Sequence, residues 1–212
     1  MYRLALIIIM FISSQIQAQV PIKNQYEAGM QKAFALWQDN KLDAAVNLFE
    51  RIASAEKDNW LPNYYAAQIL IIDGFTKLKD AKQLDAQLLR AQDFINDATT
   101  SSKNNPELLV LQAMKYTVYV ASDGAKYGMV LAPKVSQLYE KALKLDPKNP
   151  RAILNRAEWN IGSAKYFGQD TKPFCKEFDK ALELFANFKP ESKFHPNWGE
   201  KRAKELIQSC KV

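Results

Sequence analysis

Apolar residues recur at spacings of three and four along most of this chain, which is the pattern of helices that bury one face. In the clearest stretch, Tyr139, Ala142 and Leu143 fall on one stripe of a helix. Pro147 ends that helix, because the residue before a proline is disfavoured in the α region. The pair Asn149-Pro150 that follows predicts an N-cap and the first residue of a new helix.

The same pattern predicts four helix pairs and a last helix. The pairs span residues 22–39 with 42–56, 61–77 with 81–101, 105–121 with 133–145, and 150–167 with 171–188, and the last helix spans 197–210. Residues 122–132 hold Gly124 and Gly128 and are expected to form a long loop. Such a loop suggests a function, although a tolerated insertion explains it equally well. Seven glycines in 212 residues is a helix-forming composition.

These pairs are copies of one unit. Residues 125–145 match residues 164–184 without a gap, and weaker copies precede them. With Ile161-Gly162, Phe178, Ala181 and Pro190 at signature positions, the chain resembles tetratricopeptide repeat (TPR) proteins over roughly residues 26–190, and its ending resembles uncharacterised secreted bacterial members. The resemblance implies an all-α fold: a right-handed α-α superhelix of about four hairpins (22–56, 61–101, 105–145, 150–188) with a C-terminal capping helix (197–210).

The first residues predict export. Arg3 precedes an unbroken apolar run over 4–12, and a more polar stretch then ends at the small residue Ala18. This predicts a signal peptide over 1–18 and a mature domain over 19–212, placed in the periplasm or secreted. The apolar run falls short of the ~20 residues that span a bilayer, so we expect no membrane insertion after cleavage. A retained anchor stays open because Ile16 is bulky for a residue near a cleavage site.

The charge and the cysteines narrow the function classes. The net charge of +6 comes from scattered lysines rather than a basic stripe, so we expect no nucleic-acid partner, while an acidic partner stays open. Cys175 and Cys210, the two cysteines, lie in helices that should be neighbours, and we expect them to form a disulfide. The alternative is a pair of buried reduced thiols. Two cysteines are too few for a zinc site.

Candidate catalytic chemistry is sparse. The single histidine, His195, lies in a turn before the last helix, a position that is more often structural than catalytic. Residues 54–57 match a serine-x-x-lysine pattern, but the companion motifs of that enzyme class are missing. We therefore expect no enzyme activity, no catalytic residue, no metal and no cofactor.

Surface recognition is the remaining class, because stacked hairpins line a concave groove with their first helices. The preferred hypothesis is a noncatalytic scaffold that binds a peptide or an envelope protein in this groove. The expected groove residues, for which core packing is the alternative, are Met30, Phe34, Trp37, Tyr64, Gln68, Glu107, Val110, Met114, Arg151, Leu154 and Glu158. The competing hypothesis is a periplasmic small-ligand binding or transport-accessory protein. Its cavity would be lined by Tyr127, Trp159 and Tyr166, for which ordinary packing between helices is the alternative. The partner's identity, the oligomeric state and the occupancy of the groove by the N-terminal tail stay open.

Overall fold

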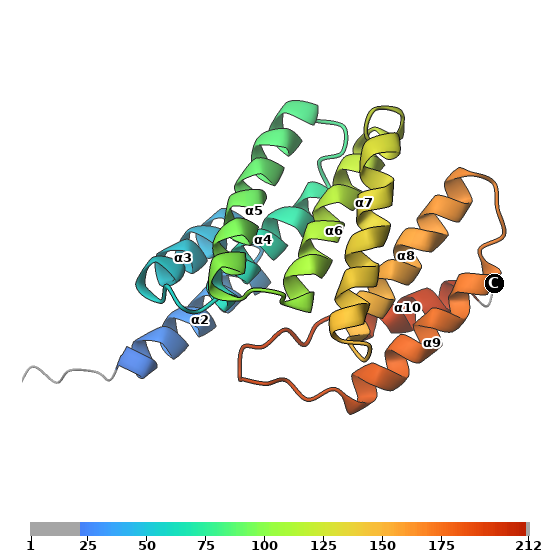
Figure 1. Cartoon of the computed structure of the whole chain (residues 1–212). Helices are drawn as coiled ribbons and strands as arrows, with labels where there is room; N and C mark the ends of the chain where they lie inside the picture. The colour runs from blue at the N-terminus through green and yellow to red at the C-terminus, as the bar shows by residue number, and fades with distance from the viewer. Residues whose placement is uncertain (1–21, 211–212) are drawn as a thin grey trace, which may run out of the picture.

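The computed structural model describes residues 22–210, and these residues form nine α-helices and no strand (Figure 1). The helices are α2 (Ile22–Gln38), α3 (Leu42–Ala55), α4 (Leu61–Gly74), α5 (Ala81–Ser101), α6 (Pro106–Ser122), α7 (Gly124–Leu145), α8 (Pro150–Tyr166), α9 (Lys172–Asn187) and α10 (Glu200–Cys210). The predicted all-α class is confirmed for this part of the chain. The signal peptide expected over 1–18 lies outside the described residues.

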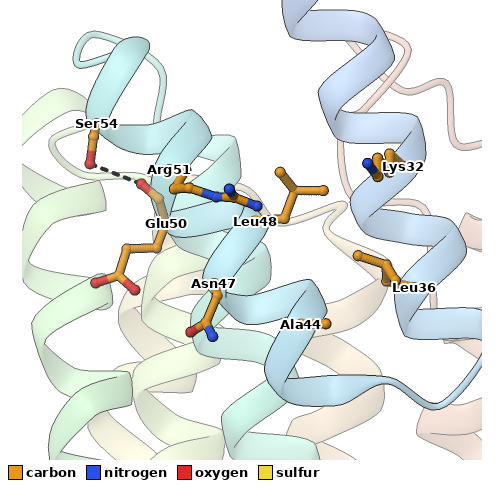
Figure 2. Close-up of a pocket in the computed structure, with 8 residues that line it drawn as sticks. All are labelled: Lys32, Leu36, Ala44, Asn47, Leu48, Glu50, Arg51 and Ser54. Carbon is orange, nitrogen blue, oxygen red and sulfur yellow. Dashed lines mark hydrogen bonds between the residues drawn. The ribbon is translucent and has the colours of Figure 1, made fainter.

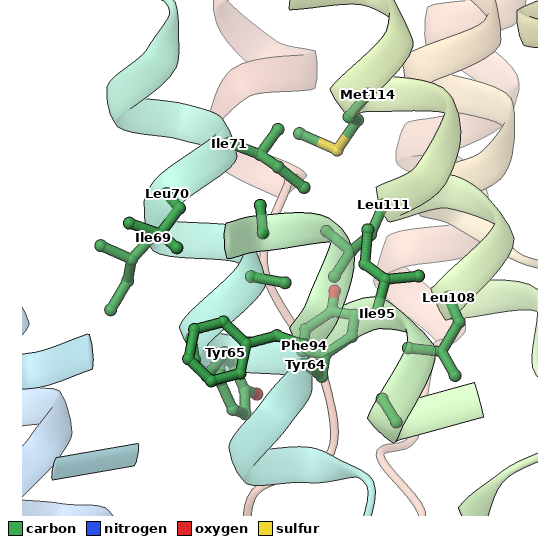
Figure 3. Close-up of a cluster of buried hydrophobic side chains, with 14 of the residues drawn as sticks. Tyr64, Tyr65, Ile69, Leu70, Ile71, Phe94, Ile95, Leu108, Leu111 and Met114 are labelled. Carbon is green, nitrogen blue, oxygen red and sulfur yellow. The ribbon is translucent and has the colours of Figure 1, made fainter. Parts of the chain in front are cut away.

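The helices pack in consecutive pairs. α2 packs with α3, α4 with α5, α6 with α7, and α8 with α9, while α4, α6 and α8 contact one another in succession. The larger buried cluster extends from α2 to α8, and the part of it between α4, α5 and α6 holds Tyr64, Ile71, Phe94 and Leu111 (Figure 3). The first helices of the pairs therefore form one continuous row, which we call the first-helix face.

Short polar side chains begin the helices where the sequence predicts. The side chain of Asn149 accepts a hydrogen bond from the backbone N–H of Ala152 at 2.9 Å, and Pro150 is the first residue of α8. Asn105 and Pro106 repeat this arrangement at the start of α6. Each cap satisfies a backbone donor that the first turn leaves without a helical partner, and each proline stands where its missing N–H costs nothing.

The prediction of a loop over residues 122–132 is wrong. α7 begins at Gly124 and continues through Pro133, so almost all of this segment is helical. The Asp123 side chain accepts from the backbone N–H of Lys126 at 2.9 Å and starts the helix. The ring of Tyr127 then packs on Tyr119 at a centroid distance of 5.1 Å. This tertiary contact and the cap offset the low helix propensity of two glycines and a proline.

The last helix covers the fourth pair. Ala203 and Ile207 of α10 are buried against Phe178 and Phe185 of α9. Cys175 near the start of α9 and Cys210 at the end of α10 form the predicted disulfide, with a Cα–Cα distance of 6.0 Å. The bond holds α10 at the end of the row.

Residues 188–199, which join α9 to α10, do not take the short route between the two helices. This crossing segment runs back along the first-helix face as far as α2 and returns to α10 (Figure 1). The ammonium of Lys193 lies 3.0 Å from the carboxylate of Glu27 on α2. In the described part of the chain, the protein's own C-terminal residues therefore cover the face on which we expected a partner to bind, whereas the sequence had left only its occupancy by the N-terminal tail open.

Over residues 22–210, every helix is too short or too polar to cross a bilayer.

Candidate functional site: an aromatic cleft on the first-helix face

Two hollows among the described residues differ in size and in the side chains that line them. The larger, about 680 Å³, is open and lies between α2 and α3 on the outer side, where Lys32, Asn47, Glu50 and Arg51 reach solvent (Figure 2). The smaller, about 340 Å³, lies between the first-helix face and the crossing segment. We assign the candidate site to the smaller hollow, because buried aromatic walls with a few convergent polar groups characterise ligand sites better than size does.

We call the smaller hollow the aromatic cleft. It is lined by Phe34 and Trp37 of α2, Tyr65 and Gln68 of α4, and Lys193, Phe194, His195, Asn197 and Trp198 of the crossing segment. The Phe34 ring is nearly parallel to the Trp37 and Phe194 rings, with interplanar angles of 18° and 19°. Tyr65 meets Phe34 edge to face at 4.6 Å. The walls of the cleft are therefore largely aromatic, and their rings also pack against one another.

Two hydrogen bonds fix the crossing segment over α4. The Tyr65 hydroxyl donates to the carbonyl oxygen of Phe194 at 2.8 Å, and the Trp198 indole N–H donates to the Tyr64 hydroxyl at 2.7 Å. Burial raises the pKa of both tyrosines, so their hydroxyls stay protonated at neutral pH. The roof of the cleft is thus held in place by neutral, directional bonds as well as by aromatic packing.

Gln68 is the polar group of the cleft that most needs a partner. Its residue is 1% exposed, and its Oε1 makes no hydrogen bond within the described residues. A buried polar atom without a partner costs about 1–3 kcal/mol. The amide therefore favours a ligand or a water that supplies a hydrogen bond from inside the cleft.

His195 lines the cleft, and its ring contacts the rings of Trp60 and Phe188 at centroid distances of 5.9 and 6.0 Å. Its side chain is 12% exposed. Burial lowers the pKa of the imidazole and nearby Arg151 lowers it further, while the carboxylates of Glu107 and Glu191 act in the opposite direction. The net shift is downward, so the ring is neutral at pH 7.

A buried ion pair lies beneath the crossing segment. Arg151 of α8 donates from Nε and Nη2 to the two carboxylate oxygens of Glu107 of α6, each at 2.8 Å, and Asn149 donates to the same carboxylate at 2.6 Å. The Phe188 ring covers the guanidinium at 4.3 Å. These contacts tie the start of the crossing segment to the junction of α6 and α8.

The structure separates the expected groove residues into three groups. Phe34, Trp37 and Gln68 line the aromatic cleft, and Tyr64 touches it through Trp198. Glu107 and Arg151 bind each other, and Glu158 accepts two hydrogen bonds from Arg202 of α10. The side chains buried in the core are those of Met30, Val110, Met114 and Leu154. The proposed cavity residues Tyr127, Trp159 and Tyr166 line neither hollow.

The sequence analysis missed the half of the cleft that the crossing segment supplies. Lys193 and Phe194 lie in a stretch without helical or strand periodicity. Asn197 and Trp198 were expected to begin the last helix, which starts at Glu200 instead, so no pattern placed these residues near α2. One signal was available: aromatic residues are concentrated between Phe188 and Trp198, where a solvent-exposed linker would be polar.

The described residues thus form an all-α fold of paired helices with a covered aromatic cleft. No protein-family model matches the chain, and no curated protein matches it in sequence. Among solved structures it is similar to the HusA haemophore from Porphyromonas gingivalis, with a TM-score of 0.74 and 24% identity. The alignment covers 87% of this chain and 92% of that one, so the two share the fold over nearly their whole length.

Proposed function

We propose that this protein is an exported, noncatalytic carrier that binds a flat aromatic ligand of the porphyrin class in the aromatic cleft. The observation that carries the proposal is the set of parallel rings of Phe34, Trp37 and Phe194, closed over by the crossing segment. The shared fold with a protein described as a haemophore supports the same ligand class. The disulfide suits an oxidising compartment outside the cytoplasm, in keeping with the predicted signal peptide.

The cleft fits part of such a ligand. A hollow of about 340 Å³ is at the small end of ligand pockets, and a substituted porphyrin is larger, so one edge of the ring would enter while the rest stays at the surface. The aromatic walls match the ring faces. Lys193 at the rim, half exposed, offers a cation for a carboxylate on the ligand's outer edge.

A titration tests this function. Ferric haem and metal-free protoporphyrin are each added to residues 19–212, and binding is followed by absorbance and by quenching of tryptophan fluorescence, since Trp37 and Trp198 line the cleft. Trp37→Ala should weaken the binding of both ligands about tenfold or more, a loss of about 1.4 kcal/mol or more of binding free energy. Phe167→Ala is the matched control, because Phe167 is an exposed aromatic outside the cleft.

Unchanged affinity in Trp37→Ala would place the ligand elsewhere, and failure of the parent to bind either porphyrin would end the carrier proposal.

The second candidate, a protein-binding scaffold, would then be favoured. Its supporting observation is the exposed apolar surface at the start of α7 and the end of α8, where Met129 and Tyr166 are 91% and 71% exposed. Tyr166 borders Gly124, so the two ends are adjacent. The TPR superhelix and the peptide-binding groove stay interpretations that belong to this candidate.

A further inference from the structure

One corner of the molecule carries large apolar side chains that nothing in the described chain covers. They lie in the second turn of α7 and at the end of α8, and they are Met129, Val130, Tyr166 and Phe167. Met129 is 91% exposed and Phe167 is 68% exposed. The ring of Tyr166 borders Gly124, the first residue of α7, so the two groups occupy neighbouring parts of the surface. We call this surface the α7–α8 corner.

Exposed lysines flank these apolar residues. They lie at the start of α7, at the end of α8 and at the start of α9, and they are Lys126, Lys165, Lys172 and Lys176. The carboxylates in the same segments are those of Asp123 and Asp170, which accept hydrogen bonds from backbone N–H groups at the starts of α7 and α9 at 2.9 and 3.0 Å. With four ammonium groups and two carboxylates, the corner has a net positive charge.

The opposite edge of the row has lysines without this apolar surface. Lys57, Lys103 and Lys148 are exposed there, in the turns that lead into α4, α6 and α8. Of the large apolar residues exposed in the described chain, only Leu145 lies beside these turns, and it is 44% exposed. The combination of projecting apolar side chains and lysines is therefore a property of one side of the row.

We propose that the α7–α8 corner docks on the surface of an anionic lipid bilayer. The apolar side chains enter the boundary between headgroups and acyl chains, while the lysines stay beside the headgroup phosphates. A protein partner fits this surface less well, because the centres of protein interfaces are depleted in lysine. A methionine that is 91% exposed also projects outward instead of lining a groove for a peptide. The docking is peripheral and independent of the proposed carrier function.

Flotation with lipid vesicles tests the docking in the full mature chain, residues 19–212. Vesicles of pure phosphatidylcholine are compared with vesicles that contain phosphatidylcholine and phosphatidylglycerol in equal amounts. The apolar variant combines Met129→Ser with Phe167→Ser. Its matched control combines Leu89→Ser with Leu145→Ser, because both leucines are exposed outside the corner. Circular dichroism establishes that each variant is folded.

A second pair of variants removes charge. The corner variant changes three lysines of the corner to glutamine: Lys126→Gln, Lys165→Gln and Lys172→Gln. The control variant makes the same change on the opposite edge: Lys57→Gln, Lys103→Gln and Lys148→Gln. The two variants have the same net charge, so a difference in their vesicle binding depends on where the lysines lie.

We expect the parent to bind the mixed vesicles more tightly than pure phosphatidylcholine and to be released by high salt. The affinity for mixed vesicles should fall about tenfold or more in both corner variants and about threefold or less in both controls. Failure of the parent to bind the mixed vesicles, or equal losses in corner and control variants, would overturn the docking. Neither result changes the carrier proposal, because none of the substituted residues lines the aromatic cleft.

Discussion

Arg151 and Glu107 were expected to face a groove, and instead they neutralise each other in the interior. Their side chains are 0% and 3% exposed, although the two residues are 44 apart in the chain. The sequence could place both on the first-helix face, because helical periodicity gives the face of each helix. It could not reveal their pairing, which depends on how α8 lies against α6 and on the cover that Phe188 provides.

Removing one partner of this pair should be costly. We expect Arg151→Met to lower the free energy of unfolding by about 3–5 kcal/mol, because the Glu107 carboxylate is left buried without its main partner. The double change Glu107→Leu with Arg151→Met should recover a large part of that loss, since no charge remains unpaired. Urea unfolding of parent, both single variants and the double variant measures the coupling. Additive losses would contradict the tight pairing.

Lys115 gives the stability a predictable pH dependence. Burial on α6 lowers its pKa to about 8, although the carboxylates of Asp85 and Asp93 act in the opposite direction. The unfolded chain has the ordinary value of about 10.4. Between these two values the unfolded state binds more protons than the folded state, so stability rises as the pH rises through this window. The full effect is up to about 3 kcal/mol.

The measurement is best made between about pH 7.5 and 9.5, because buried tyrosines with raised pKa values reduce stability once the unfolded chain begins to ionise near pH 10. Lys115→Met should be more stable than the parent at pH 7 and lack this rise. The difference between the two proteins should therefore narrow as the pH increases. A constant difference across the range would show that the ammonium is not destabilised in the folded state.

At the scale of the elements, periodicity and helix-ending residues predict where most helices lie. They do not predict the boundaries that depend on contacts with other elements. Asn149 and Pro150 mark the start of α8, as expected, since a cap is a local interaction. The start of α7 was missed because Gly128 and Pro133 are poor helix formers by themselves, and contact with α6 outweighs that tendency. The crossing segment has no periodicity that could place it, because it is stabilised by bonds to residues more than a hundred positions away, and only its aromatic composition indicated burial.

Substitution by alanine should change the stability in opposite directions at two glycines, Gly199 and Gly162. Gly199 has a φ of 111°, and an added Cβ would lie 2.7 Å from Cζ of Phe185, so Gly199→Ala should destabilise the turn into α10 by more than about 1 kcal/mol. Gly162 lies on the exposed side of α8 with nothing within 4 Å of an added Cβ. Gly162→Ala should stabilise the protein by about 0.5–1 kcal/mol. The melting temperatures of the two variants measure the difference. Equal changes in melting temperature would contradict the different surroundings assigned to the two glycines.

For the whole molecule, the crossing segment is expected to act as a wall of the core. Replacing residues 188–198 by a glycine-serine linker of equal length keeps α10, Gly199 and the disulfide but uncovers Phe34, Tyr65 and the Arg151 guanidinium. We expect a lower melting temperature and strong binding of a fluorescent apolar dye, because a contiguous aromatic surface becomes exposed. The same linker inserted between α3 and α4 controls for added flexibility. Unchanged dye binding would mean that the segment connects α9 to α10 without covering the aromatic surface.

The contact between Lys193 and Glu27 joins residues 166 positions apart, from the segment before the last described helix to the first. In a linear array of repeats each unit touches only its neighbours, so the ends can fray independently of the middle. Here the crossing segment contacts α2 through Lys193 and Phe194, so the first and last elements of the described chain share contacts. Unfolding should follow one cooperative transition. Five of the nine residues that line the aromatic cleft belong to the crossing segment, so a growing chain has no complete cleft until this segment has been made.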